Sequence, residues 1–217
     1  MLKYIWLDFS KPILPQLPAP FRSAALLFHP FIEMPKWWVL KYKRDDYFYP
    51  TNEEILQYGT PVTWSRICEI CKFPSIDVLL FALMSNIFAL SDPFERQDLA
   101  TQLSKHLPET IFIPNSDVTS PFLWKHFIDL LKSTGSNSLY WTDPIHSQSM
   151  TFPIGYADPL RLSQLSTHVL LVSGDPTRFA FMSQYDSFVT VFLSSEESIE
   201  PLIEHYQFEA IICDEEI

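Results

Sequence analysis

Glycine is scarce in this sequence, and its scarcity excludes several phosphate-binding motifs. The 217 residues include only four glycines, and successive glycines lie at least nineteen positions apart. Phosphate-cradling loops need clustered glycines because their backbone N–H groups must approach the anion closely. A Rossmann fingerprint and a P-loop are therefore excluded.

Cysteine is also scarce. Three cysteines are too few, and odd in number, for the disulfide framework of a secreted domain. Cys68 and Cys71 form a CxxC pair late in a predicted helix, where the helix dipole disfavours a thiolate. Structural zinc commonly needs two such pairs. We interpret both cysteines as buried core residues, with metal or redox chemistry as the alternative.

Long apolar runs are missing. The most apolar segment, 78–90, is thirteen residues long and includes Ser85 and Asn86. A membrane-spanning helix needs roughly 20 apolar residues. The N-terminus has no apolar stretch of signal-peptide length. We expect a soluble cytoplasmic protein without membrane association.

Positive charge is in deficit, with 15 basic and 26 acidic residues and a net charge of −11. This charge repels nucleic-acid phosphates, so nucleic-acid binding is disfavoured. Residues 36–44 combine four cations with three aromatic residues and could hold a single strand by stacking. Asp45 and Asp46 follow directly. We interpret the segment as an exposed β-ribbon with inward aromatic residues and snorkelling lysines.

The negative charge is concentrated at the C-terminus. The last 23 residues contain eight acids and no lysine or arginine, so residues 1–194 carry only 15 − 18 = −3. A capping box from Ser194 to Glu197 predicts a helix that ends near Tyr206. Its acidic face is a candidate partner-binding surface made of Glu196, Glu197, Glu200 and Glu204. This face could steer a basic partner, or it could only be solvated.

Two further groups are candidates for function. Tyr185 and Asp186 lie at the tip of a predicted hairpin, where tyrosine could anchor a partner or the residues could serve only the turn. Asp143 and His146 could support acid–base work or close a hydrogen-bonded loop. The six histidines are never within four residues of one another, and no G-x-S-x-G elbow occurs. We predict no catalytic residues, metal ligands or cofactor.

The pattern of elements predicts an α+β fold. We expect one compact unit over 1–217, with a proline-rich wrap in 1–50, a helical region in 51–134 and a C-terminal mixed sheet in 138–217. The wrap holds seven of the eighteen prolines and two short strands, Lys3–Leu7 and Ala24–Phe28. Its aromatic density indicates packing onto the core.

Local signals predict the individual elements. The first predicted helix begins with a capping box, Thr51–Glu54, and ends at Gly59. The other predicted helices are Thr63–Cys71, Ile76–Leu90 with Ser75 as its cap, Pro93–His106, Thr119–Ser133 and Pro159–Leu165. The predicted C-terminal strands are Ser138–Trp141, Met150–Ile154, Val169–Val172, the hairpin Phe179–Met182 with Phe188–Leu193, and Phe208–Cys213.

Four strings spread along the chain carry a resemblance to a known family. They are Tyr4–Asp8 (YIWLD), Gly59–Trp64 (GTPVTW), Phe179–Phe188 (FAFMSQYDSF) and Glu209–Asp214 (EAIICD). Together they resemble an uncharacterised bacterial family of small cytoplasmic proteins, a domain of unknown function. The resemblance spans nearly the whole chain and implies a bacterial, intracellular, single-unit protein. It implies no activity and no functional residues.

These observations favour a non-enzymatic protein-binding module that meets a basic partner with its acidic C-terminal face. A concrete version is an immunity protein that neutralises a cationic nuclease toxin, since such a partner must mimic a polyanion. The alternative is a small-molecule-binding protein or enzyme with a pocket between the N-terminal aromatic wrap and the sheet. A cleft with converging polar groups such as Asp143, His146 or Tyr185 would favour that alternative.

Overall fold

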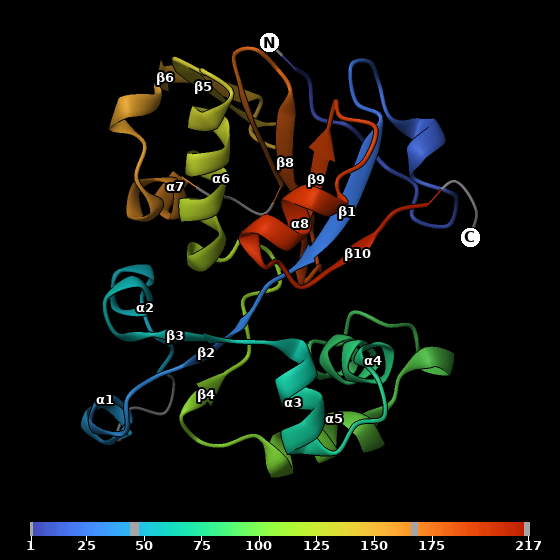
Figure 1. Ribbon diagram of the computed structural model, residues 1–217. Coiled ribbons are helices and arrows are strands. Elements are labelled where there is room, and N and C mark those ends of the chain that lie inside the picture. The colour runs from blue at the N-terminus through green and yellow to red at the C-terminus, as the bar shows by residue number, and fades with distance from the viewer. Residues whose placement is uncertain (1, 44–47, 166–168, 215–217) are drawn as a thin grey trace. The chain divides into compact units, whose positions relative to one another are not determined.

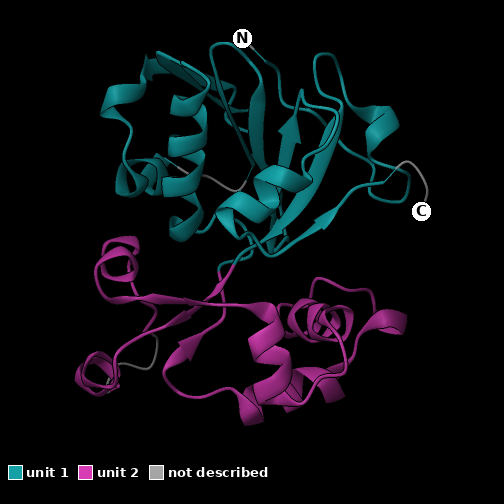
Figure 2. Ribbon diagram, in the orientation of Figure 1, with its two compact units in different colours: residues 1–29, 115–217 teal, residues 30–114 magenta. Residues whose placement is uncertain are grey.

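The computed structural model describes residues 2–43, 48–165 and 169–214. The chain forms two compact units (Figure 2): unit 1 contains residues 1–29 and 115–217, and unit 2 contains residues 30–114. Unit 2 is thus inserted into unit 1 between its first strand and its first long helix. The predicted helical region 51–134 divides between the two units.

Unit 1 is built on a seven-stranded sheet among the described residues, with the strand order β10-β1-β9-β8-β7-β5-β6. Every described strand pair is antiparallel, so the sheet predicted as mixed is antiparallel in all of these pairs. The α+β class and the β8–β9 hairpin are confirmed. The strands are β1 (Ser23–Phe28), β5 (Ser138–Asp143), β6 (Gln148–Pro153), β7 (Leu170–Gly174), β8 (Phe179–Ser183), β9 (Val189–Ser194) and β10 (Ala210–Ile212).

One face of this sheet packs against the helices of unit 1, as Figure 1 shows. They are α6 (Pro121–Ser133), α7 (Pro159–Leu165) and α8 (Glu200–Tyr206), and a short 3-10 helix, η3 (Ile154–Tyr156), precedes α7. The ring of Phe127 in α6 stacks on that of Phe181 in β8, with centroids 3.7 Å apart. Because strand side chains alternate between faces, only every second residue reaches this helical core.

The proline-rich N-terminal segment covers the opposite face. Its apolar side chains, Ile13 and Phe21 among them, pack against Leu171, Met182 and Val191 of the sheet. The predicted packing of the wrap onto a core is therefore confirmed in this segment. A short 3-10 helix, η1 (Leu14–Gln16), interrupts it.

The predicted strand at Lys3–Leu7 is wrong, because these residues form no strand ladder. They pack against the sheet through side chains instead. The Tyr4 hydroxyl donates to the Ser183 carbonyl over 2.9 Å. The apolar run Tyr4–Leu7 therefore marked a segment that lies on a sheet, not one of its strands.

Unit 2 combines a small three-stranded sheet, ordered β3-β2-β4, with helices α1 to α5. The strands β2 (Phe31–Glu33), β3 (Thr60–Val62) and β4 (Ile111–Phe112) were not predicted, since each has at most three residues. The helices are α1 (Lys36–Tyr42), α2 (Asn52–Tyr58), α3 (Trp64–Cys71), α4 (Ile76–Asn86) and α5 (Gln97–His106), with η2 (Asp92–Phe94) before α5. None of the described helices is both long and apolar enough to span a membrane.

Side-chain caps begin two of these helices as predicted. Thr51 and Glu54 form a reciprocal capping box at α2. The Ser75 hydroxyl accepts the Val78 N–H at the start of α4. Such caps satisfy N–H groups that have no partner within the helix, so they can be recognised from short sequence spacings.

The β-ribbon predicted for residues 36–44 is wrong, because residues 36–42 form helix α1. Pro35 precedes the helix in an extended conformation. The helical period buries Trp38 and Val39 and leaves Trp37 and Leu40 exposed. Arg44 lies outside the described residues.

The helix predicted to open at Ser194 begins later. Helix α8 starts at Glu200, and its N-cap, Ile199, makes no side-chain cap. Ser194 ends strand β9, and its hydroxyl accepts the Glu196 N–H over 3.0 Å. The predicted capping box is therefore wrong, because the serine closes a turn after a strand.

A buried polar cluster lies where the chain leaves unit 1 and where it returns. His29 is 1% exposed, and its Nδ1 lies 3.3 Å from the Asn115 carbonyl oxygen. Its Nε2 lies 2.9 Å from Thr190 Oγ1, which is 3.2 Å from Thr119 Oγ1. Since a carbonyl only accepts, Nδ1 donates and Nε2 accepts in the neutral ring. Burial lowers the pKa of His29 to about 4.

Candidate functional site

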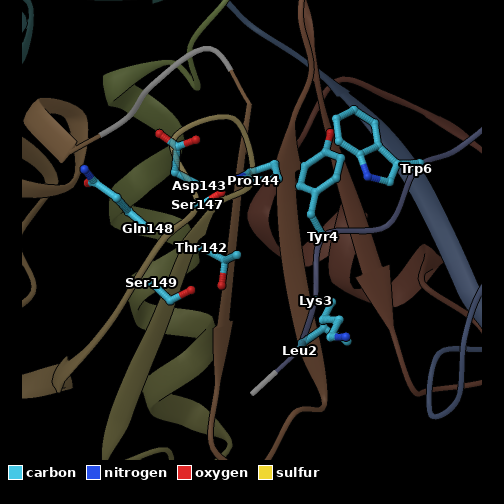
Figure 3. Close-up of a pocket in the computed structure, with 10 residues that line it drawn as sticks. All are labelled: Leu2, Lys3, Tyr4, Trp6, Thr142, Asp143, Pro144, Ser147, Gln148 and Ser149. Atoms are coloured by element: carbon cyan, nitrogen blue, oxygen red, sulfur yellow. The ribbon is translucent and has the colours of Figure 1, made fainter.

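A pocket of about 670 Å³ lies in unit 1 between the N-terminal segment and the β5–β6 hairpin. Figure 3 shows the two groups of residues that line it. The N-terminal segment contributes Leu2, Lys3, Tyr4 and Trp6, and the hairpin contributes Thr142, Asp143, Pro144, Ser147, Gln148 and Ser149. The pocket expected from the sequence lay beside the aromatic wrap, but the aromatic residues 37–49 of that wrap belong to unit 2, and this pocket is lined by residues from the segment 2–6 instead.

Asp143 shapes the hairpin wall. Its side chain is 1% exposed, and its Oδ1 accepts the backbone N–H groups of Ile145 and His146 over 2.9 and 3.0 Å. Its Oδ2 lies 2.7 Å from His146 Nδ1. The hydrogen-bonded loop considered from the sequence is therefore present, and it also brings the carboxylate and the imidazole into contact. Ser147 completes the loop with a φ of 51°.

Tyr4 holds the opposite wall in place. Its hydroxyl is tied to the Ser183 carbonyl, and burial raises its pKa to about 12. The ring of Trp6 meets that of Tyr4 edge to face, with centroids 4.8 Å apart. Trp6 is nevertheless 72% exposed, so most of its indole surface is available to a ligand.

Two polar groups of the pocket have no protein partner. The Oγ1 atom of Thr142 is buried and makes no hydrogen bond in the described structure. Lys3 is exposed, and its ammonium forms no ion pair with any described residue. A buried hydroxyl without a partner costs about 1–3 kcal/mol. The pocket thus offers a cation, hydroxyl and amide donors and an aromatic surface.

The described residues contain no group of three or more histidine, cysteine, aspartate and glutamate side chains placed to hold a metal ion. Cys68 and Cys71 are buried in α3, as predicted for core residues. Burial also raises the pKa of the Cys71 thiol.

The acidic candidates do not form one uniform face. Glu197 pairs with Arg22 over 3.0 Å, and Glu196 pairs with Arg178. The acidic C-terminal segment therefore does have compensating cations, supplied by distant parts of the chain. Glu200 and Glu204 are exposed one turn apart on α8 and form no described ion pair. Glu215 and Glu216 lie outside the described residues.

Tyr185 and Asp186 lie in the β8–β9 connection, as predicted. Tyr185 is 62% exposed. Asp186 has a φ of 50°, and its N–H donates to Asp117 Oδ1 over 3.1 Å. Turn geometry thus accounts for the aspartate, and the two residues lie apart from the pocket lining.

Sequence reasoning missed most of the pocket. Lys3, Trp6 and Thr142 were not predicted as site residues because they carry no motif, and the two walls are more than 130 residues apart along the chain. Asp143 was the available signal, as a carboxylate three residues before His146. His29 was missed as well, since only its burial distinguishes it from the other histidines.

The antiparallel sheet, its helical layer and an open pocket without a recognisable catalytic set describe an α+β protein of unassigned activity. The chain belongs to a protein family of unknown function, DUF2711, whose profile matches residues 10–217. It is 38% identical to the uncharacterized protein YwbB of Bacillus subtilis (strain 168), and the match covers 99% of this chain and 96% of that protein. The predicted family resemblance is confirmed. No solved structure matches the chain significantly.

Proposed function

We propose that the pocket beside the β5–β6 hairpin binds a small organic anion with an apolar or ring-shaped body. One observation carries the proposal: a lysine without a described ion-pair partner and a largely exposed tryptophan line the same cavity. A carboxylate or another oxyanion is the group that pairs with the ammonium and also accepts from neutral donors such as Ser147 and Gln148. Lys3 supplies charge, and the exposed side chains of the hairpin supply neutral donors.

The charge balance of the pocket supports an anion. Asp143 is the only carboxylate among its lining residues, and its two oxygens already accept from His146 and two backbone N–H groups. The Lys3 ammonium, in contrast, has no ion-pair partner among the described residues, so it is the charged group of the lining that can meet a ligand. This cation contrasts with the net charge of −11 that the whole chain carries.

The apolar part of the ligand would meet the aromatic wall. Trp6 exposes most of its ring beside the pocket, and indole surfaces favour contact with rings and aliphatic groups. Ser147, Gln148 and Ser149 add exposed hydrogen-bonding groups along the hairpin. This combination of a few polar groups with apolar surface is typical of small-molecule sites.

Matched fragments test the proposal. We expect aromatic carboxylates such as benzoate to shift the amide resonances of Thr142 and Ser147, and their neutral amides such as benzamide to shift them far less. Lys3→Gln should remove this preference. Lys11→Gln is the matched control, because Lys11 lies in the same segment but pairs with Asp8 over 2.8 Å. Equal binding of acid and amide, or unchanged binding by Lys3→Gln, would refute the proposal.

A second function, binding of a basic protein partner, rests on Glu200 and Glu204. These exposed carboxylates lie at i and i+4 of α8, hence on one side of the helix, and lack described ion-pair partners. A pair of this kind can accelerate the approach of a cationic protein. A toxin-neutralising immunity protein is the specific version of this function, and the product of a neighbouring gene is the partner to test.

Charge-reversal variants distinguish the carboxylates without described ion-pair partners, Glu200 and Glu204, from the paired carboxylate of Glu197. Glu200→Lys with Glu204→Lys should weaken such binding, and added salt should weaken it further. Glu197→Lys is the informative comparison, because that carboxylate is already paired with Arg22. Binding that ignores both salt and the double reversal would exclude the electrostatic version.

A further inference from the structure

A second hollow, in unit 2, has a different chemistry. It has a volume of about 450 Å³ and is formed by the end of α1, the residues before α2 and the first turn of α2. Four aromatic side chains and two carboxylates line it together with one threonine: Trp38, Tyr42, Phe48, Tyr49, Thr51, Glu53 and Glu54. Among the described residues of its lining there is no lysine, arginine or histidine.

The aromatic rings are held in defined positions. The Trp38 ring lies 4.6 Å from the Tyr42 centroid and 5.9 Å from that of Phe48. The Tyr49 hydroxyl donates to the Ile113 carbonyl over 2.9 Å, which fixes the outer ring. Aromatic faces carry negative charge density, so rings grouped around a cavity attract a cation.

The carboxylate oxygens of Glu54 already accept hydrogen bonds from neutral donors. Trp38 Nε1–H donates to its Oε1 over 3.0 Å, and the Thr51 N–H and hydroxyl each donate to its Oε2 over 3.0 Å. Burial acts to raise the pKa of Glu54, but these hydrogen bonds and one from Tyr42 outweigh it and lower the pKa. Neither Glu53 nor Glu54 forms an ion pair with a described residue.

A lysine of α1, the helix that carries Trp38 and Tyr42, lies against one of the aromatic rings. Lys41 Nζ lies 4.7 Å from the Tyr42 ring centroid and donates to its hydroxyl over 3.0 Å. The hydrogen bond to Tyr42, with a smaller contribution from the charge of Glu54, raises the pKa of Lys41. A cation thus already lies against one ring of the hollow.

We propose that this hollow binds a quaternary ammonium group, with the rings of Tyr42, Phe48 and Tyr49 around the cation and the carboxylates of Glu53 and Glu54 beside it. A quaternary ammonium brings charge but no hydrogen-bond donors. It therefore suits a carboxylate whose oxygens already accept from Trp38 and Thr51. A guanidinium or primary ammonium would have to compete with those donors. This site lies in unit 2 and the anion pocket in unit 1, so each proposal can fail without the other.

The sharpest test uses two ligands of the same shape on the full-length protein. Choline carries the quaternary nitrogen, and 3,3-dimethylbutan-1-ol replaces that nitrogen with carbon. We expect choline to shift the Trp38 indole N–H resonance in a saturable manner at millimolar concentration and the neutral alcohol to leave it in place. Equal shifts with both ligands, or no shift with choline, would overturn the proposal.

Variants test whether choline binds in the hollow. Tyr49→Leu should weaken choline binding by roughly 2- to 30-fold because it removes one ring, and Tyr49→Phe should retain most of the affinity. Lys41→Gln should strengthen binding, because the competing internal cation is lost. Trp37→Phe is the control, since Trp37 lies on the same helix but outside the lining. Loss of affinity with Tyr49→Phe as large as with Tyr49→Leu would refute the role of the ring.

Discussion

Replacement of His29 by glutamine should remove a specific part of the acid sensitivity of this protein. The ring is 1% exposed, and it accepts from Thr190 only through a neutral Nε2. Glutamine can still offer an oxygen to the Thr190 hydroxyl but has no proton to gain in this range. Wild type and His29→Gln should therefore differ in how their stability varies with pH.

The size of the effect follows from the pKa values. The pKa of His29 falls from 6.5 to about 4 on folding because of burial. Between these values the unfolded state binds the additional proton, so stability is full above the unfolded pKa and declines as pH falls toward 4. At 1.36 kcal/mol per pKa unit, the loss is about 2 kcal/mol at about pH 5 and about 3 kcal/mol near pH 4.

Urea unfolding followed by tryptophan fluorescence measures this difference. Carboxylates titrate in both proteins, so the wild-type curve minus the variant curve isolates the imidazole. Thr119→Ala provides the control, because it removes a hydroxyl 3.2 Å from Thr190 Oγ1 and leaves the ring in place. It should cost about 1 kcal/mol at every pH. Parallel pH profiles for wild type and His29→Gln would refute the assignment of a buried neutral histidine.

Three other outcomes follow from the packing and the caps. Phe127→Ala should destabilise the fold by about 3–5 kcal/mol in urea unfolding, because the side chain is fully buried against Phe181; a loss below about 1 kcal/mol would contradict this packing. Thr51→Ala should cost about 1 kcal/mol, since it breaks the capping box of α2, whereas Thr101→Ala on the exposed side of α5 should cost little. The Cys71 thiol should react with iodoacetamide only at the rate of unfolding, because burial hides it and raises its pKa; rapid labelling of the native protein would contradict this.

Elements with local signals were predictable. The capping box at Thr51 and the cap at Ser75 mark α2 and α4 within four residues of sequence. Helix α7 has the bounds that its sequence predicted, Pro159–Leu165. Periodicity was weaker evidence where aromatic and charged residues alternate, and so α1 was predicted as a ribbon. Ser194 shows the same limit, because a capping-box spacing at the end of a strand begins no helix.

The candidate sites depended on contacts between distant residues. Asp143 and His146 are three residues apart and could be paired from the sequence. Lys3 and Thr142 have no such relation, and they line one pocket only because the N-terminal segment packs across the sheet beside β5. The partners of Glu196 and Glu197 also lie outside the acidic segment: Arg22 is far from Glu197 along the chain, and Arg178 comes just before the β8–β9 hairpin that Glu196 follows.

The sequence by itself determined the fold class, most helix starts, the β8–β9 hairpin and the exclusion of glycine-rich phosphate loops. These properties depend on backbone preferences and side-chain spacings within a few residues, and so they can be seen without tertiary contacts. Only the tertiary structure decided that Glu197 pairs with Arg22, that His29 is buried and that Lys3 and Thr142 line one pocket. Each of these depends on strand pairing and packing over more than a hundred residues of chain, for which no local pattern exists.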